Sequence, residues 1–183
     1  MKSRVIAVLG TAAVLVSGAT SVAVAAASQT ITGGNTQITL NTHTMQVLQN
    51  RNFALVPIAG ATDRRGVLRL PTTGGTANPP NYTIKQGGGF SLVKAAKKVL
   101  VTHLVFNTKS HQATGAVAGH GTIVVFVIGD PNAGNGGPGK VEFGGYPVKL
   151  SNGFARVLDN TYNTQVFAKH TAFGTGASTV YFH

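Results

Sequence analysis

Two stretches of the chain are apolar on both of the faces that an extended strand presents. The first is Val99–Phe106, and the second is Thr122–Ile128, which reads TIVVFVI. β-Branched residues dominate both runs, and their spacing does not match a helix. Strands that are apolar on both faces are typically buried on both sides. We therefore predict a mainly β fold, an antiparallel β-sandwich or closed barrel, with these two runs as central strands.

Glycine and proline divide much of the remaining chain. Gly87–Gly89 separates the strand-like segments Tyr82–Gln86 and Phe90–Lys94. Because glycine reaches positive φ without strain, we predict a hairpin at this point. Pro71–Pro80 is expected to be a loop, and Asp130–Lys140 an exposed, mobile loop of Gly, Asn and Pro. Alternation of apolar and polar residues predicts three further strands: Thr36–Leu40, Phe53–Ile58 and Ser178–Phe182.

Two short helices are predicted, each directly after a strand. The first extends to about Asn50, with Asn41, Thr42 and Thr44 as candidate caps. The second has Ser151 and Asn152 as candidate caps, with Phe154 and Leu158 on one face. The two strand–helix units share residues 110 positions apart: Ile38 and Val148, Leu40 and Leu150, Val47 and Val157, Leu48 and Leu158, Asn50 and Asn160. This is either coincidence among common residues or a sign that the units occupy related ends of one scaffold.

The first 27 residues have the layout of a secretory signal peptide. Lys2 and Arg4 precede the apolar run Val5–Val16, and small residues follow as far as Ala27. We expect cleavage there, which leaves residues 28–183 as a single secreted β domain. No later apolar run approaches the roughly 20 residues that a spanning helix needs, so no transmembrane helix is expected after cleavage. The predicted location is extracellular, in association with the cell surface.

Cysteine is absent, so disulfides and thiolate metal ligands are excluded and the core must hold by apolar burial. The chain has 15 Lys and Arg against four Asp and Glu, and loss of Lys2 and Arg4 leaves 13 scattered basic side chains. Such a charge distribution attracts anionic partners. Outside the cell these are anionic cell-envelope polymers or lipid head groups. Nucleic acid is not expected, because no aromatic residues are interleaved with the basic ones for base stacking.

Few side chains have the spacing of a functional site. Tyr82 and His103 are the candidate cofactor-binding residues. His103 lies in the alternation with Val99, Val101 and Val105, and an imidazole there can ligate a metal or haem iron. The alternative for both is a packed or hydrogen-bonded core position. His111 and His120 can flank one hairpin, but no carboxylates lie nearby in sequence to complete a metal site, so no metal is predicted. The remaining histidines are expected at exposed polar positions: His43, His170 and His183.

Catalysis is not predicted. The four acids are far apart in the sequence, whereas a glycosidase needs two carboxyl groups facing each other across a cleft: Asp63, Asp130, Glu142 and Asp159. Gly134–Lys140 reads GNGGPGK and has the outline of a phosphate-binding loop. However, Val141 replaces the Ser or Thr that binds magnesium, and a strand-like segment follows where that mechanism requires a helix.

Several short motifs occur in a defined order along the chain. They are Ile38–Leu40 before Val47 and Leu48, Leu70–Gly75 (LPTTGG), Ile84–Leu92 (IKQGGGFSL), and Val157–Asn160 before Phe167 and Gly174. This order resembles a group of exported proteins from Gram-positive bacteria and, more distantly, the HtaA-type domain of surface haem-uptake proteins. The resemblance covers most of residues 28–183 and implies an all-β fold with small helices.

The same resemblance bears on haem binding. In the HtaA family, haem is held by a tyrosine on an early helix and supported by a histidine next to the glycine turn. Here the helix Thr44–Asn50 has no tyrosine, and Gln86 precedes the glycines. Neither ligand carries over, so the resemblance implies the fold and argues against haem binding by that mode.

We therefore expect an exported, cell-envelope-associated binding or structural protein without catalytic activity and without a cofactor. One alternative is an HtaA-like protein that binds haem or another small ligand. A second alternative is a secreted hydrolase, which requires a deep cleft with two close carboxyl groups.

Overall fold

Eight antiparallel strands close into a barrel in the computed structural model, which describes residues 28–169 and 171–183. The predicted signal segment, residues 1–27, lies outside the described residues. The barrel strands are β1 (Gln29–Leu40), β4 (Val67–Asn78), β5 (Asn81–Gln86), β7 (Lys97–Asn107), β8 (Gln112–Val117), β9 (Gly121–Ile128), β11 (Lys140–Leu150) and β12 (Ala172–Phe182). Their order is β7-β5-β4-β1-β12-β11-β9-β8, and pairing of β8 with β7 closes the ring. The predicted mainly β class is confirmed, in its barrel form.

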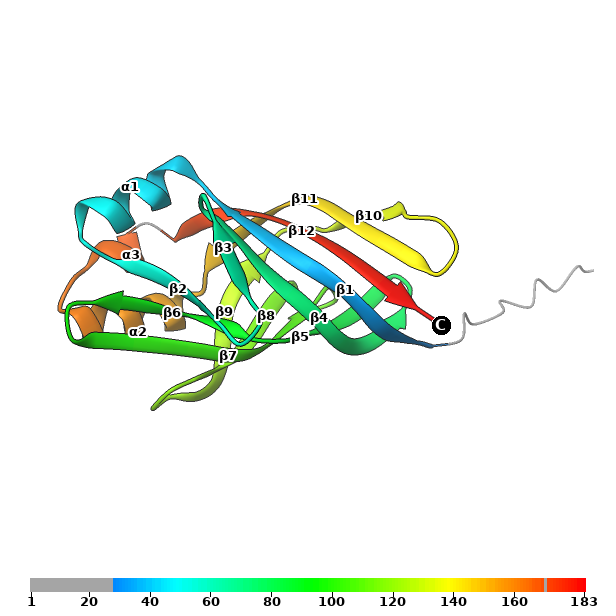
Figure 1. Ribbon diagram of the computed structural model, residues 1–183, viewed down its shortest axis with the longest axis horizontal. Helices are drawn as coiled ribbons and strands as arrows, with labels where there is room; N and C mark the ends of the chain where they lie inside the picture. Colours follow the sequence, from blue (N-terminus) through cyan, green and yellow to red (C-terminus); the bar gives the residue numbers. More distant parts are fainter. Residues whose placement is uncertain (1–27, 170) are drawn as a thin grey trace, which may run out of the picture.

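Four shorter strands extend the barrel wall. β6 (Gly89–Lys94) pairs with β7, and β2 (Ala54–Ile58) pairs with β6. β3 (Thr62–Arg64) pairs with β4, and β10 (Asn132–Asn135) pairs with β11. The helices of the described residues are α1 (Thr42–Asn50), α2 (Asn152–Tyr162) and α3 (Val166–Lys169), one more than the sequence predicts. All three lie at the same end of the barrel (Figure 1).

Strand direction explains why the helices gather at one end. β1 and β11 are both antiparallel to β12, so they run in the same direction and end on the same side. The two predicted N-caps are confirmed: the Asn41 side chain accepts the Thr44 N–H at 2.6 Å, and the Ser151 hydroxyl accepts the Phe154 N–H at 3.0 Å. The two strand–helix units with the shared residue pattern therefore occupy related positions on either side of β12.

A β-bulge explains why Val99–Phe106 is apolar on both faces. The pairing of β7 with β8 shifts register between Thr102 and Val105, and His103 takes a left-handed backbone with φ +51°. The extra residue exchanges the two faces of the strand. His103 is consequently exposed, and the predicted alternation that placed it with Val105 on one face throughout is wrong. The inward residues are Val99 and Val101 before the bulge and Leu104 and Phe106 after it.

The predicted hairpin at Gly87–Gly89 is wrong. β5 and β6 do not pair with each other; both pair with the same side of β7, β5 at Val105–Asn107 and β6 at Lys97–Thr102. Gly87–Gly89 form a bend between β5 and β6, which follow one another along the same side of β7. A Cβ on Gly88 would lie 2.3 Å from the Ile58 carbonyl oxygen, so close backbone approach is what requires glycine here. The tight turn lies later, between Lys94 and Lys97.

Two predicted loops also contain strand. β4 continues through Pro71. Along one side of β4, β3 pairs with Val67–Arg69 and β5 pairs with Thr72–Asn78, so Pro71 lies between the two paired segments. A proline N lacks a hydrogen, and in this gap no ladder bond from it is needed. In the segment Asp130–Lys140, β10 forms a hairpin with β11.

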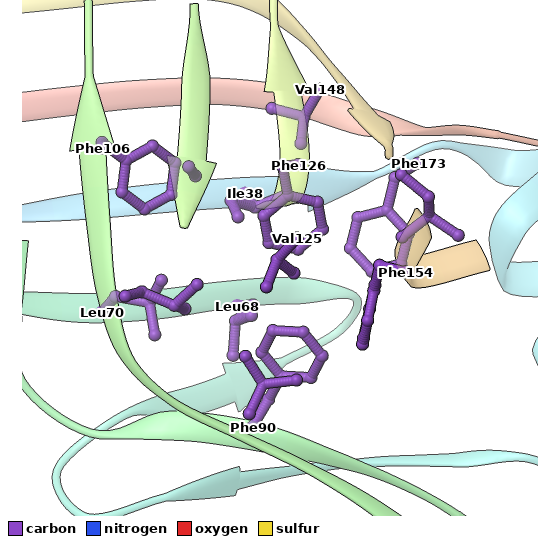
Figure 2. Close-up of a cluster of buried hydrophobic side chains, with 14 of the residues drawn as sticks. Ile38, Leu68, Leu70, Phe90, Phe106, Val125, Phe126, Val148, Phe154 and Phe173 are labelled. Carbon is purple, nitrogen blue, oxygen red and sulfur yellow. The ribbon is translucent and has the colours of Figure 1, made fainter. Parts of the chain in front are cut away.

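The core fills the barrel with aromatic and branched aliphatic side chains. Figure 2 shows Phe90, Phe126 and Phe154 beside Leu68 and Val125 in one cluster. The Phe90 and Phe126 rings are stacked with centroids 5.9 Å apart, and Phe154 meets Phe90 edge-on at 6.5 Å. α2 therefore closes the helix end of the barrel by inserting Phe154 into the aromatic cluster. None of the helices in the described part of the chain has the length and apolarity needed to cross a membrane.

Candidate functional site

The helix end of the barrel carries a shallow apolar depression with a cavity volume of about 10 Å³. It lies where α1, α3, β11 and β12 meet, so segments distant in sequence contribute to one wall. We call it the helix-end depression, and its lining residues are His43, Thr44, Val47, Leu48, Leu150, Val166, Phe167 and Phe173. His43 contributes the one imidazole among these residues, and the other side chains are mostly apolar.

Hydrogen bonds to the end of β12 fix α1 beside the depression. The Asn41 amide donates to the Ala172 carbonyl at 3.1 Å, and the Thr44 hydroxyl donates to the same oxygen at 2.9 Å. Thr44 and Leu48 are the buried residues of α1 and hold the helix against the barrel. His43 and Val47, four residues apart, share a face and both line the depression.

The opposite wall is held by a buried carboxylate. The Asp159 side chain on α2 accepts the backbone N–H groups of Phe167 at 3.0 Å and Ala168 at 2.8 Å, and so caps the start of α3. Phe167 then packs edge-on against Phe53, with ring centroids 5.2 Å apart. Phe173 contacts Phe126 of the core cluster at 5.2 Å. The aromatic wall of the depression is therefore continuous with the core and firmly positioned.

Sequence analysis missed His43, which it placed among exposed polar residues. Its side chain is indeed exposed, but it also borders the apolar wall. The available signal was the i, i+4 spacing of His43 and Val47 on a capped helix, which places an imidazole beside an apolar residue. Phe167 and Phe173 are brought near His43 only by the tertiary structure, so no local sequence pattern predicts that they share a surface with it.

Gln86, at the position before the glycines, belongs to a buried polar network inside the barrel. The Tyr146 hydroxyl lies 2.7 Å from the Ser178 hydroxyl, which lies 2.9 Å from the Thr36 hydroxyl. When the Gln86 amide oxygen accepts from Thr36 at 2.8 Å, its nitrogen donates to the carbonyls of Leu70 at 3.1 Å and Pro71 at 3.2 Å. This orientation satisfies both ends of the amide. Gln86 thus ties β5 to β1 and β4 and does not face the helix-end depression.

The far end of this network is a strongly buried phenol. Burial raises the pKa of Tyr146 to about 12, and the hydrogen bond with Ser178 opposes part of that rise. Tyr146 and Ser178 border a second, small apolar cavity of about 10 Å³, together with Ile84, Phe106, Thr108, Ile128, Pro131 and Phe143. The network stabilises the barrel interior, and this neutral phenol is not a base at physiological pH.

The two predicted cofactor-binding residues are not brought together. Tyr82 is buried on β5 and packs edge-on against Phe143, with centroids 4.9 Å apart, and burial raises the pKa of its phenol. His103 is exposed on the β7 bulge, with its Nδ1 3.0 Å from the Thr102 hydroxyl. Neither residue borders the helix-end depression.

The other predicted histidine pair is also separated. His111 directly precedes β8 and His120 lies in the turn that follows it, so they occupy opposite ends of one strand. His183 is exposed at the end of β12, and His170 lies outside the described residues. Across residues 28–169 and 171–183, no three or more His, Asp or Glu side chains are grouped so as to hold a metal ion.

The four acids occupy separate environments. Asp130 pairs with His111 at 3.3 Å, Glu142 pairs with Lys140 at 2.5 Å, and Asp159 caps α3. Asp63 on β3 lies opposite Leu68, and its buried Oδ1 has no hydrogen-bond partner among the described residues. The structure thus does not bring Asp130 and Glu142 together as a pair of facing carboxylates.

The barrel is similar to two solved domains. The C-terminal domain of HtaA from Corynebacterium glutamicum matches with a TM-score of 0.63 and 11% sequence identity, over 84% of this chain and 98% of that one. The N-terminal domain of HtaA from that organism gives 0.59 and 13%, over 83% and 99%. No family model and no curated protein matches the chain. The likeness shows a shared fold and confirms the distant resemblance predicted from the sequence motifs.

Proposed function

We propose that this chain is a non-catalytic binding domain that holds a flat, apolar ligand of the haem class at the helix-end depression. The observation that carries the proposal is the position of His43, an imidazole on the early helix at the border of an apolar wall containing Phe167 and Phe173. The shared HtaA fold supports it, because the family resemblance implies a haem ligand on the equivalent early helix.

The donor set fits this class of ligand, although it differs from the family pattern. Haem iron takes an axial nitrogen, oxygen or sulfur donor, and histidine is a common one. α1 contains no tyrosine, and Gln86 is committed to the barrel interior, so the tyrosine–histidine pair of the family is absent. His43 would hold the iron in place of the tyrosine, and the partly exposed Val47 and Val166 would contact the macrocycle.

The size of the depression limits how such a ligand would bind. Its cavity volume of about 10 Å³ is far below the range of roughly 300–1,000 Å³ typical of small-molecule pockets. A tetrapyrrole would therefore lie over the depression and not inside it. Binding without catalysis agrees with the separate environments of the four acids.

Titration with haem tests the proposal directly. We expect the purified protein to shift the Soret band of haem on binding, His43→Ala to abolish the shift, and His120→Ala to leave it intact, because His120 is an exposed turn residue. His43→Tyr should restore binding with the spectrum of a phenolate ligand. No Soret shift with the unmodified protein, or full binding by His43→Ala, would overturn the proposal.

A further inference from the structure

The turn between β6 and β7 concentrates positive charge at the helix end of the molecule. Lys94 and Lys97 are directly opposite each other in the pairing of the two strands, and Lys98 follows on β7. We call these three residues the lysine hairpin. Figure 1 shows this turn projecting at the end where α1, α2 and α3 lie. Because neighbouring strand residues point to opposite faces, Lys98 projects from the other side of the hairpin to Lys97.

This arrangement places two like charges, Lys94 and Lys97, directly opposite each other. Two cations directly opposite each other on antiparallel strands repel, so the pair does not stabilise the hairpin by itself. The Tyr162 hydroxyl instead holds the hairpin to α2: it donates to the Leu92 carbonyl and accepts the Val99 N–H at 3.1 Å. The charges are therefore presented on a rigid support that other contacts maintain.

Contacts within the protein orient the ammonium groups of Lys94 and Lys97, and both groups retain N–H donors for a ligand. Lys94 Nζ lies 4.9 Å from the centroid of the Phe53 ring, a cation–π contact. Lys97 Nζ donates to the Thr161 carbonyl at the end of α2, at 2.7 Å. An ammonium group has three N–H donors, so Lys97 retains two after this bond.

No described carboxylate neutralises the lysine hairpin. The ion pairs in the described residues are His111 with Asp130 and Lys140 with Glu142, and neither includes a lysine of the hairpin. The acid on neighbouring α2, Asp159, is buried and accepts two backbone N–H groups of α3.

The C-terminal turn of α2, whose Thr161 carbonyl accepts from Lys97, also borders an open polar hollow. It has a volume of about 500 Å³ and is lined by side chains that flank Thr161 in sequence: Asp159, Asn160, Asn163, Thr164 and Gln165. Three of these carry carboxamides, which donate to and accept from hydroxyl groups. The hollow therefore suits a hydroxylated chain segment, next to cations that suit phosphate.

We propose that the lysine hairpin and this hollow bind a linear polyanion in which phosphodiester groups alternate with hydroxylated units. Lysine ammonium groups bind phosphate oxygens as compact point charges. A single small anion cannot contact lysines on opposite sides of the hairpin, whereas a chain passing around the turn can. Because Lys97 and Lys98 project from opposite sides of the hairpin, a flat lipid surface cannot contact both, so a polymer is favoured over lipid head groups. This inference does not depend on the haem-class ligand.

Binding to poly(glycerol phosphate), measured by calorimetry at two salt concentrations, tests the proposal. Three phosphate contacts predict about 20- to 40-fold weaker binding at 200 mM than at 50 mM salt, because counterion release sets the slope. The variant Lys94→Gln/Lys97→Gln/Lys98→Gln should lose most of this binding and most of its salt dependence. Lys98→Glu alone, at a position with no internal contact to lose, should weaken binding while leaving the thermal melt unchanged.

A charge-matched variant separates a site from general attraction. Lys85→Gln/Lys109→Gln/Lys149→Gln removes the same three charges from exposed positions on other elements, and it should bind as the unmodified protein does. An equal loss in both triple variants would overturn the proposal, since net charge alone would then explain binding. Preferential binding to phosphatidylglycerol vesicles over the soluble polymer would also overturn it.

Discussion

The buried network inside the barrel gives the sharpest test of how this fold is held together. The chain of hydrogen bonds runs from Tyr146 through Ser178 and Thr36 to Gln86, which ends on two backbone carbonyls. Thr36 is fully buried and acts in the middle of the chain, where it accepts from Ser178 and donates to Gln86. Tyr146 lies at the end and makes one of these bonds.

Replacement of Thr36 by valine keeps the shape of the side chain and removes its hydroxyl. It leaves both the Ser178 hydroxyl hydrogen and the Gln86 oxygen without a partner. Each unsatisfied buried group costs about 1–3 kcal/mol, so Thr36→Val should lower the free energy of unfolding by roughly 2–6 kcal/mol. Tyr146→Phe removes a terminal donor while Ser178 can still donate to Thr36, so its cost should be about 1 kcal/mol.

Urea unfolding followed by circular dichroism measures both values, and an unchanged m-value shows that only stability has altered. Thr39→Val is the matched control, because Thr39 lies on the same strand, β1, with an exposed side chain. Its effect should stay within about 0.5 kcal/mol. If Thr36→Val costs no more than Tyr146→Phe, the network is not a connected chain and the reasoning fails.

Three further predictions follow from single contacts. First, the Tyr146 phenol has its pKa raised to about 12 in the fold and an ordinary value near 10 when unfolded, so it contributes stability below pH 10 that is lost between pH 10 and 12. Thermal melts across that range should show a shallower alkaline decline for Tyr146→Phe, and an identical decline would contradict the assignment. Second, a Cβ on Gly176 would lie 2.1 Å from the Tyr146 ring, whereas one on Gly144 meets nothing within 4 Å. Overpacking should make Gly176→Ala about 1–3 kcal/mol less stable, with Gly144→Ala nearly neutral in the same urea assay. Third, Ser151→Ala removes both the N-cap that accepts the Phe154 N–H and the hydroxyl that donates to the Val124 carbonyl, and should cost about 2 kcal/mol of unfolding free energy, whereas Ser151→Thr, which keeps a hydroxyl, should retain most of it.

The fold class and the helix starts could be predicted because their signals are local. β-Branched runs and N-cap residues act within a few positions of the chain, so the strands around Val101 and Phe126 and the caps Asn41 and Ser151 follow from the sequence. The choice between a sandwich and a barrel depends on whether β8 returns to β7, and no local pattern encodes that pairing.

The wrong predictions arise where one residue changes the face that its neighbours occupy or the strand with which they pair. The bulge at His103 exchanges the faces of β7, so an alternating pattern was extended across a point where it reverses. The Gly87–Gly89 bend and Pro71 have the composition of turns, but both lie where the barrel edge changes partners. Glycine and proline mark a break in pairing there, and the sequence does not distinguish that break from a reversal of the chain.

Strand direction also explains why both candidate binding surfaces lie at one end. β1 and β11 flank β12 and run the same way, so α1 and α2 leave the barrel together, and α2 in turn positions α3 through Asp159. The β6–β7 turn joins them because Tyr162 of α2 bonds to both of its strands. The helix-end depression and the lysine hairpin therefore share α2 as a support. Loosening the C-terminal turn of α2 should disturb both, whereas replacement of His43 or Lys98 should affect one alone.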